Sequence, residues 1–285
     1  MYSYALSIRQ GFFADDRFIE AARRSKVRKF EVVLDGSQPF DTAIANIRKA
    51  HDAWGLEAAS VHIPFGNAPW VPSRESERKE ALAAIRGVLD AWHGVRRYTL
   101  HGCTEADRDV PRAEQMRALR VFLSEMLPDL ERHDASFNVE YLPRTCLCNT
   151  PEELEEAVAG FPPNRIGICL DVNHASPRTA EMPAMIRRLG PRINSFHISD
   201  TDGVDECHWY PGEGIIDWPA CMAEIKALKR DVLLILEVFR LPFPSWQEAW
   251  HHNDLSSDLA AMEQNVLFLE NAEEFVRRRA ALQIP

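Results

Sequence analysis

The chain has 285 residues, and its 33 Lys and Arg against 43 Asp and Glu give a formal net charge of −10 at pH 7. This length allows one large domain or two small ones, and 46% hydrophobic with 27% charged residues excludes a disordered or collagen-like chain. The acidic balance argues against a general nucleic-acid binder, because neutralising phosphates usually takes clustered Lys and Arg.

The sequence shows no membrane or secretory segment. No apolar run approaches the ~18 residues that a transmembrane helix needs. The opening stretch, MYSYALSIRQGFF, lacks a basic region followed by an apolar one, so we predict no secretory signal. The six cysteines are thinly spread without a paired Cys-x-x-Cys motif, which favours reduced thiols. We therefore expect a cytoplasmic protein with no membrane partner.

Strand-like and helix-like segments alternate along the whole chain. Short β-branched or aromatic runs lie near 4–9, 28–34, 57–63, 95–101, 136–142, 165–171, 192–199 and 231–239. Helix-like stretches lie near 15–26, 39–54, 73–93, 111–133, 151–160, 180–190, 217–229 and 255–281. Pro111 and Pro151 stand where helices can begin, and Thr150 and Asp217 can cap the helices that follow them.

This alternation predicts right-handed strand–helix–strand crossovers and a parallel sheet, hence an α/β protein. The run 232–236 is apolar on both faces, as a sheet covered by helices requires. Eight such units favour one closed (β/α)8 TIM barrel. An open doubly wound sheet is the alternative, but no G-x-G-x-x-G follows the first strand. Because no Gly/Ser-rich linker is present, we predict a single TIM-barrel domain over 1–285.

Polar side chains recur where the predicted strands end. Six consecutive units carry a metal-capable residue at the equivalent position, and a further His follows one turn after the sixth strand. In a barrel these positions converge at the carboxyl-terminal mouth, where TIM-barrel enzymes hold their active sites. A single His or carboxylate there is often structural, but the recurrence favours a joint site. The residues are His62, His101, Glu140, Asp171, His174, His197 and Glu237.

The alternation of side chains along the strands supports this hypothesis. His197 shares a face with Ser195, while Phe196 points toward the helices, and Glu237 continues the inward row of the last strand. A carboxylate among apolar neighbours is costly unless it is paired or metal-bound. The pattern therefore indicates ligands or catalytic groups rather than surface charges.

Two mouth loops add candidates. The long loop 200–216 contains Glu206, His208 and a Pro-Gly-Glu-Gly turn, whose glycines could serve a tight turn or the close approach of a ligand. The loop after the third strand brings Trp70 near the mouth. Arg240, like Arg9 and Glu31, could reach a substrate or form an ordinary ion pair. The helix 255–281 could cap the barrel or form a dimer contact.

Taken in order, SVHIPFG, TLHG, FNVEYLP, CLDVNHA, SFHISD, HWYPGEGIIDW and LILEVF resemble the xylose isomerase-like TIM-barrel superfamily. That superfamily holds sugar isomerases, epimerases and endonuclease IV-type enzymes. In its ketose 3-epimerase-like members one divalent ion is held by a Glu, an Asp, a His and a Glu. The two Glu act as acid and base on opposite faces of the substrate. By resemblance, the metal ligands are Glu140, Asp171, His197 and Glu237, with Glu140 and Glu237 catalytic and His174 contacting substrate.

The endonuclease IV branch instead uses three zinc ions and nine ligands. The matching positions are His62, His101, Glu140, Asp171, His174, His197, Glu206, His208 and Glu237, where Glu206 departs from the Asp of that branch. The acidic net charge and the lack of a Lys/Arg cluster in the mouth loops favour a small polyol substrate.

We therefore predict a divalent-metal-dependent sugar or polyol isomerase or epimerase that moves a proton between Glu side chains through a metal-stabilised enediolate. Three carboxylates and one His suit Mn²⁺, Co²⁺ or Mg²⁺, with Zn²⁺ as a further candidate. His62, His101, His174, His208, Trp70, Glu206 and Arg240 would bind substrate or orient the ligands. The alternatives are a lyase, dehydratase or deglycosidase acting on an oxidised sugar, a trizinc abasic-site phosphodiesterase, and a non-catalytic barrel. We expect a small-molecule sugar partner and no nucleic acid, and the chain could form a homo-oligomer.

Overall fold

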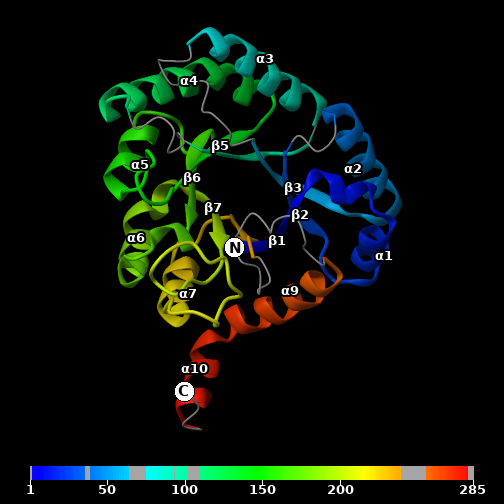
Figure 1. Ribbon diagram of the computed structural model, residues 1–285, viewed down its shortest axis with the longest axis vertical. Helices are drawn as coiled ribbons and strands as arrows, with labels where there is room; N and C mark the ends of the chain where they lie inside the picture. The colour runs from blue at the N-terminus through cyan, green and yellow to red at the C-terminus, as the bar shows by residue number, and fades with distance from the viewer. Residues whose placement is uncertain are drawn as a thin grey trace.

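Eight parallel strands close into a barrel in the computed structural model, which describes residues 2–35, 39–63, 75–92, 94–101, 109–238 and 255–281 (Figure 1). Each strand pairs with the next along the chain, and β8 returns to β1. The strands are β1 (Tyr2–Arg9), β2 (Lys29–Val33), β3 (Glu57–His62), β4 (Arg97–Leu100), β5 (Ser136–Glu140), β6 (Ile166–Asp171), β7 (Ile193–Ile198) and β8 (Val232–Leu236). The closed order confirms the predicted (β/α)8 barrel and excludes the open sheet.

Helices surround the barrel as a ring in Figure 1. They are α1 (Asp16–Arg24), α2 (Phe40–Trp54), α3 (Glu75–Ala91), α4 (Arg112–Arg132), α5 (Pro151–Val158), α6 (Met182–Leu189), α7 (Trp218–Ala227), α9 (Leu255–Glu270) and α10 (Ala272–Ala281). Short 3₁₀ turns lie at Gln10–Ala14, Asn173–Ala175, Thr179–Glu181 and Gly190–Arg192. Among the described helices, none combines the length and hydropathy that a membrane span requires.

The predicted helix starts are confirmed at several termini. The side chain of Thr150 accepts a hydrogen bond from the backbone N–H of Glu153 at the start of α5. Asp217 accepts one from the N–H of Ala220 at the start of α7. These caps satisfy N–H groups that the first helical turn leaves without partners.

On strands β1 and β8 the inward-facing side chains change from apolar to polar along the barrel axis. Ala5, Leu233 and Ile235 form a small apolar cluster that is separate from the main core, whereas Phe196 and Ile198 belong to the main core under the helices. Two residues further along their strands, the inward row is polar, at Ser7 on β1 and at Glu237 after β8. On β1 and β8 the inward row is therefore apolar toward the amino end of the barrel and polar toward the carboxyl end.

The last helical stretch differs from the prediction. The sequence predicts one helix over 255–281, but α9 ends at Glu270 and α10 begins at Ala272. Asn271 makes the break, because its backbone N–H bonds to Phe268 and its side-chain amide donates to the carbonyl of Leu267. Helix α9 lies in the ring beside α1 and α7, and α10 extends away from the barrel (Figure 1).

Candidate metal centre

Three carboxylates and one imidazole meet at the carboxyl ends of strands β5 to β8. Glu140 and Asp171 end strands β5 and β6. His197 lies one residue before the end of β7, and Glu237 directly follows β8. All four side chains are buried, and one ligand atom from each lies within 4.8 Å of the others. The barrel thus brings together the four residues that the sequence predicts as metal ligands.

The ring nitrogen Nδ1 of His197 lies at the centre of this group. It is 3.0 Å from Oε2 of Glu237, 3.1 Å from Oε1 of Glu140 and 3.6 Å from Oδ2 of Asp171. One ring nitrogen carries at most one hydrogen, so it cannot satisfy three carboxylates. Among the described residues, Oδ2 of Asp171 and Oε2 of Glu237 are buried without a hydrogen bond of regular geometry. This donor set fits a divalent cation bound between the four side chains.

The charges of the group depend on one another. Burial alone would raise the pKa of Glu140, but His101 and His197 hold that pKa well below its usual range. Burial alone would lower the pKa of His197, but the groups around it, Cys169 first and then the carboxylate of Glu237, raise it well above the ordinary value. A bound cation would likewise stabilise the ionised form of these carboxylates.

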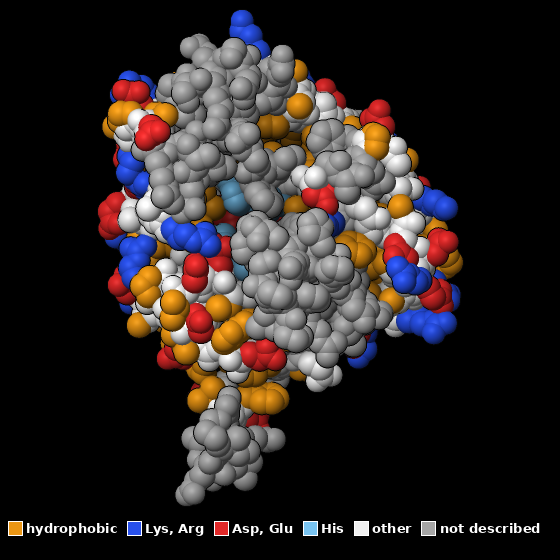
Figure 2. Space-filling view, viewed as in Figure 1, with side chains coloured by type: hydrophobic (Ala, Val, Ile, Leu, Met, Phe, Trp, Pro, Cys, Tyr) orange, Lys and Arg blue, Asp and Glu red, His pale blue; other side chains and the backbone are white. Residues whose placement is uncertain are grey.

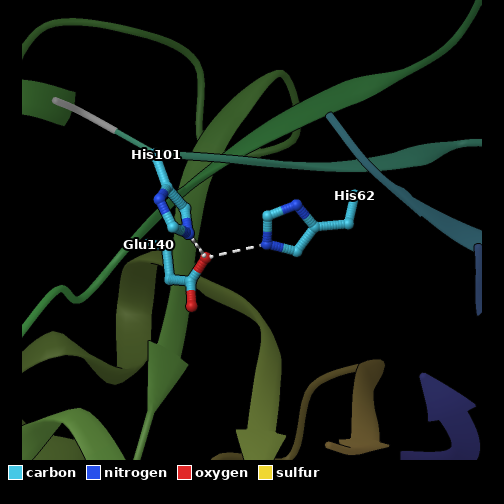
Figure 3. A group of neighbouring side chains, drawn as sticks. All are labelled: His62, His101 and Glu140. Carbon is cyan, nitrogen blue, oxygen red and sulfur yellow. Dashed lines mark hydrogen bonds and ion pairs between the residues drawn. The ribbon is translucent and has the colours of Figure 1, made fainter. Parts of the chain in front are cut away.

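A second group shares Glu140 and contains His62 and His101, from the ends of β3 and β4 (Figure 3). The two Nε2 atoms lie 3.2 Å and 3.0 Å from the same carboxylate oxygen, Oε2 of Glu140. Burial would lower the pKa of His62, but the hydrogen bond to Glu140 raises it to about 9. Glu140 therefore connects this pair of imidazoles to the four-ligand group.

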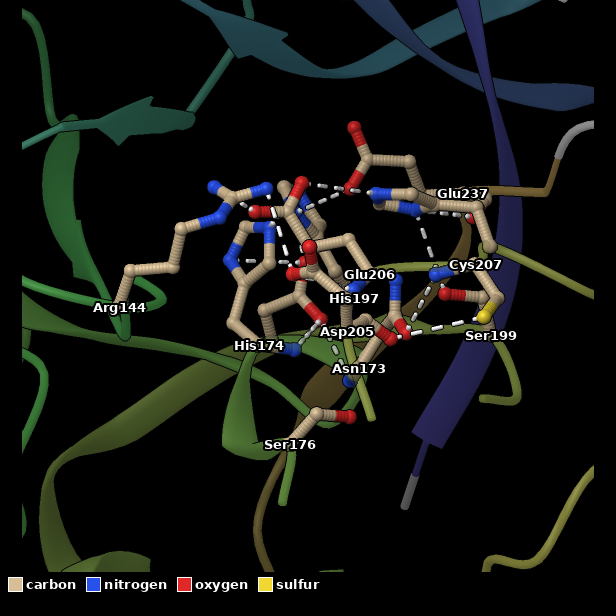
Figure 4. A network of polar contacts seen from close by, with 12 residues as sticks. Arg144, Asn173, His174, Ser176, His197, Ser199, Asp205, Glu206, Cys207 and Glu237 are labelled. Atoms are coloured by element: carbon tan, nitrogen blue, oxygen red, sulfur yellow. Dashed lines mark hydrogen bonds and ion pairs between the residues drawn. The ribbon is translucent and has the colours of Figure 1, made fainter. Parts of the chain in front are cut away.

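The third group consists of His174, Glu206 and His208. The Nε2 atoms of both imidazoles lie 3.9 Å from Oε2 of Glu206, and Nη1 of Arg144 lies 2.5 Å from Oε1 (Figure 4). Glu206 therefore occupies the position between the two imidazoles. The preceding residue, Asp205, is largely exposed and pairs with Arg144 at 3.4 Å. Arg144 is a contact that the sequence analysis did not identify.

Three of these imidazoles are oriented by backbone carbonyls. Nδ1–H of His62 donates to Ile63 at 2.9 Å, and Nδ1–H of His174 donates to Tyr141 at 2.9 Å. Nδ1–H of His208 donates to the carbonyl of Glu237 at 3.1 Å. In each ring the other nitrogen, Nε2, is thereby directed toward a carboxylate, which is how metal-binding or substrate-binding histidines are usually held.

The loop between β7 and α7 is built around Asp200, a residue whose role the sequence analysis missed. Its buried carboxylate accepts hydrogen bonds from the backbone N–H groups of Thr201, Gly212 and Ile216. It also accepts one from the indole N–H of Trp218 at 2.8 Å. These bonds tie both ends of the loop together and fix the segment that carries Glu206 and His208.

The Pro-Gly-Glu-Gly turn serves this loop. Gly212 has a φ of +94°, which favours glycine, and its N–H bonds to Asp200. A Cβ added at Gly214 would overlap the carbonyl oxygen of Thr201 and the carboxylate of Asp200. Gly212 is therefore needed for the turn, and Gly214 for the close packing of the backbone against Thr201 and Asp200.

The other residues that the sequence predicts near a substrate do not belong to these three groups. Trp70 and Arg240 lie outside the described residues. Arg9 forms an ion pair with Asp35 at 3.6 Å. Glu31, for which the sequence left a substrate contact and an ordinary ion pair equally open, is fully buried inside the barrel beside His197. Figure 2 shows histidine and acidic side chains at the centre of the face seen in Figure 1.

Curated proteins resemble the chain at low sequence identity. An uncharacterised protein of Methanocaldococcus jannaschii is 24% identical over 227 residues, covering 73% of this chain and 73% of that protein. An inosose isomerase of Bacillus subtilis is 22% identical over 175 residues, covering 58% of this chain and 63% of the isomerase.

Solved structures share the fold. A D-tagatose 3-epimerase-like protein superposes with a TM-score of 0.72 at 20% identity, over 94% of this chain and 98% of that one. An IOLI protein with a bound zinc atom gives a TM-score of 0.72 at 15% identity, over 94% and 98%. The family described as the xylose isomerase-like TIM barrel matches residues 19–265, and the chain therefore belongs to that family.

Proposed function

We propose that the protein is a divalent-metal-dependent isomerase or epimerase of a sugar or polyol. The observation that carries this proposal is the buried group of Glu140, Asp171, Glu237 and His197 Nδ1, in which two carboxylate oxygens lack a regular hydrogen bond. Buried carboxylates without partners are costly, so their presence at the barrel mouth indicates a bound cation and a functional site.

In this proposal the two Glu side chains move the proton. One of Glu140 and Glu237 removes a proton from a carbon next to a carbonyl group, and the other returns a proton to the opposite face or to the neighbouring carbon. The two carboxylates come from β5 and from the end of β8, and so approach a bound substrate from different sides. A divalent ion held here would supply Lewis-acid stabilisation of the negative charge that develops on the substrate oxygens.

The flanking imidazoles would bind the substrate. His62, His174 and His208 each have Nδ1 occupied by a backbone carbonyl, so Nε2, which faces Glu140 or Glu206, is the nitrogen left to contact a substrate. Hydroxyl groups of a sugar can both donate to and accept from such nitrogens. An inosose isomerase among the relatives, and D-tagatose 3-epimerase-like and psicose 3-epimerase structures with the same fold, support a polyol as substrate.

The identity of the ion is part of the proposal. Three oxygen ligands and one nitrogen suit Mn²⁺, Co²⁺ or Mg²⁺. The zinc in the IOLI structure keeps Zn²⁺ among the candidates. Elemental analysis of protein purified without added metal or chelator is expected to give one divalent ion per chain.

The reaction is tested by incubating the metal-loaded protein with ketohexoses and inososes in D₂O. We expect an isomer of unchanged carbon skeleton that carries one solvent deuterium at the exchanged carbon. Loss of water or of a leaving group would instead support the lyase, dehydratase or deglycosidase alternative. Absence of both deuterium uptake and elimination across the panel would contradict a proton-transfer enzyme on these substrates.

A trizinc phosphodiesterase is the second candidate function. All nine positions of the trizinc branch are described, and they form three groups, two of which share Glu140. This arrangement favours an abasic-site phosphodiesterase with three zinc ions as the competing proposal. Three zinc ions per chain together with cleavage of a duplex containing an abasic site would establish it, and one ion per chain would exclude it.

A further inference from the structure

Glu31 is a buried carboxylate inside the barrel that the proposed reaction does not use. It lies on β2 between Phe30 and Val32, which both pack in the main core outside the strands. The alternation of side chains therefore directs Glu31 inward, and its exposed fraction is 0%. A charge in such a position requires partners.

The register of the sheet supplies three hydroxyl donors to Glu31. Ser7 on β1 pairs directly with Glu31, and a shift in the pairing of β2 with β3 places Ser60 opposite it on the other side. The hydroxyls of Ser60 and Thr99 donate to Oε1 at 3.0 Å and 2.8 Å, and that of Ser7 donates to Oε2 at 3.2 Å. Three strands thus fix the carboxylate in one orientation.

The free side of Oε2 faces the candidate metal ligand His197. Oε2 lies 3.1 Å from Nε2 of His197, a contact without regular hydrogen-bond geometry, whereas Nδ1 of His197 makes a hydrogen-bond contact of 3.1 Å with Oε1 of Glu140. A carboxylate can only accept, so each contact favours a proton on the nitrogen that faces it, and with a cation at Nδ1 the contact with Glu31 keeps the remaining ring proton on Nε2. Nδ1, on the opposite side of the ring, is then left to face Glu140, Asp171 and Glu237.

Other groups around His197 do not determine which ring nitrogen carries the proton. The ring of His62 stacks on that of His197 with centroids 5.7 Å apart and planes at 24°, which fixes the plane of the ring but not its protons. The buried thiol of Cys169 also lies beside His197, and burial raises its pKa to about 11. A neutral thiol is a weak acceptor compared with an ionised carboxylate.

We propose that Glu31 is a positioning residue that holds His197 with its proton on Nε2, so that Nδ1 serves as the metal ligand. Ser7, Ser60 and Thr99 act through Glu31 by fixing its carboxylate. The inference rests on the proposed metal site, and it extends that site to the inner wall of the barrel. Carboxylate partners of this kind orient a metal-binding imidazole and increase its basicity.

The test compares Glu31→Gln with the wild-type protein by chelator competition for Mn²⁺, Co²⁺ and Zn²⁺. The carboxamide keeps the shape of the side chain but loses the charge, and we expect metal affinity to fall by about 10–100-fold. Glu263→Gln is the matched control, because that carboxylate accepts hydrogen bonds from Ser25 and Lys26 at the outside of the barrel. The control is expected to keep the wild-type dissociation constants.

An NMR measurement reports on the imidazole itself. In the Zn²⁺-loaded protein, the Nε2–H proton of His197 is expected far downfield because it faces a charged acceptor, and it should move upfield in Glu31→Gln. Cys169→Ala should leave both this resonance and the affinity near the wild-type values. A shift in Cys169→Ala with none in Glu31→Gln would assign the role to the thiol and overturn the proposal.

The remaining outcomes are also decisive. A folded Glu31→Gln protein with wild-type affinity and an unmoved resonance would overturn the role of Glu31 and leave the metal site intact. If Glu31→Gln does not fold, the double variant Ser60→Ala/Thr99→Val removes both donors to Oε1 and should lower the affinity several-fold; unchanged affinity would count against the proposal. A wild-type protein that binds none of the three ions would overturn the proposed function, and the role of Glu31 with it.

Discussion

Glu140 is the residue that joins the parts of the site. Its Oε2 faces the imidazoles of His62 and His101, and its Oε1 lies 3.1 Å from Nδ1 of His197 and 3.5 Å from Nδ1 of His174. A side chain in this position can bind a cation with one oxygen while the other remains paired with imidazole. The negative charge of Glu140 would therefore serve both to bind the cation and to accept the substrate proton.

Replacing Glu140 by Gln is expected to lower kcat by at least about 10²–10⁴-fold, because the carboxamide cannot take up or return a proton. The fold should persist, since the side chains have the same shape. The measurement is the rate of deuterium exchange into substrate, with circular dichroism as the check on folding. Glu224→Gln, at a half-buried residue on α7 that pairs with Arg187, should retain full activity. A fully active Glu140→Gln protein would contradict the mechanism.

At the scale of elements, the loop after β7 depends on close backbone packing around Asp200. Both ends of the loop bond to this one carboxylate, and Gly214 lies against it where a Cβ would overlap. The loop carries Glu206 and His208 to the barrel mouth. The positions of Glu206 and His208 therefore depend on how well this loop packs around Asp200.

We expect Gly214→Ala to destabilise the protein by about 1–3 kcal/mol, because the backbone or Asp200 must move to admit the methyl group. Gly87→Ala is the matched control: Gly87 lies within α3 with no atom within 4 Å of an added Cβ. That change should stabilise the protein by about 0.5–1 kcal/mol, since glycine is costly within a helix. Urea unfolding measures both, and equal effects of the two changes would refute the packing argument.

A second element-scale feature ties β1 to the end of α9. The hydroxyls of Tyr2 and Tyr4 donate to the two carboxylate oxygens of Glu270 at 3.0 Å and 2.9 Å. Burial and the neighbouring Glu270 raise the pKa of Tyr2 to about 12 from the ordinary 10.0. The folded protein thus retains a proton that the unfolded chain loses between these two values.

Because the folded state binds more protons in this range, its free energy of unfolding should fall as pH rises from 10 toward 12. Below pH 10 this contribution is fully present. Removing the hydroxyl by Tyr2→Phe should make the fall less steep, which denaturant unfolding at several pH values can detect. An identical pH dependence in the two proteins would show that Tyr2 does not contribute.

At the scale of the whole molecule, the barrel gathers negative charge at one end. The net charge is −10, and Glu140, Asp171 and Glu237 contribute three buried negative charges to it. A divalent ion would compensate two of them. The carboxylates of Glu31 and Asp200 are buried as well. The absence of a nucleic-acid partner stays a prediction, as do a single domain and homo-oligomer formation.

Removing bound metal with a chelator should therefore lower the melting temperature. A ligand at one hundred times its dissociation constant stabilises a protein by about 2.7 kcal/mol. For a chain of this size that corresponds to a rise in Tm of about 5 °C when Mn²⁺, Co²⁺ or Zn²⁺ is restored. Asp171→Asn should respond much less, because one of the four ligands loses its charge. An unchanged wild-type Tm would argue against a metal ion in the native protein.

The sequence by itself determined the order and type of the elements. Apolar residues at intervals of two or of three to four, with caps such as Thr150 and Asp217, depend only on neighbouring residues, and they predicted the strands and helices to within a few positions. The recurrence of metal-capable residues at strand ends predicted which side chains would meet, because parallel strands of a barrel end at one mouth. The break at Asn271 was missed, since the apolar period continues through it.

Only the tertiary structure decided what each polar residue contacts. Glu31 could equally have formed an ordinary ion pair, until the register of β1, β2 and β3 surrounded it with hydroxyls and placed it against His197. Asp200 gave no sequence signal, because its partners lie along a loop that closes on itself. Periodicity specifies the face of a strand on which a side chain lies, whereas the distance between two side chains depends on how the strands are aligned and how the barrel closes.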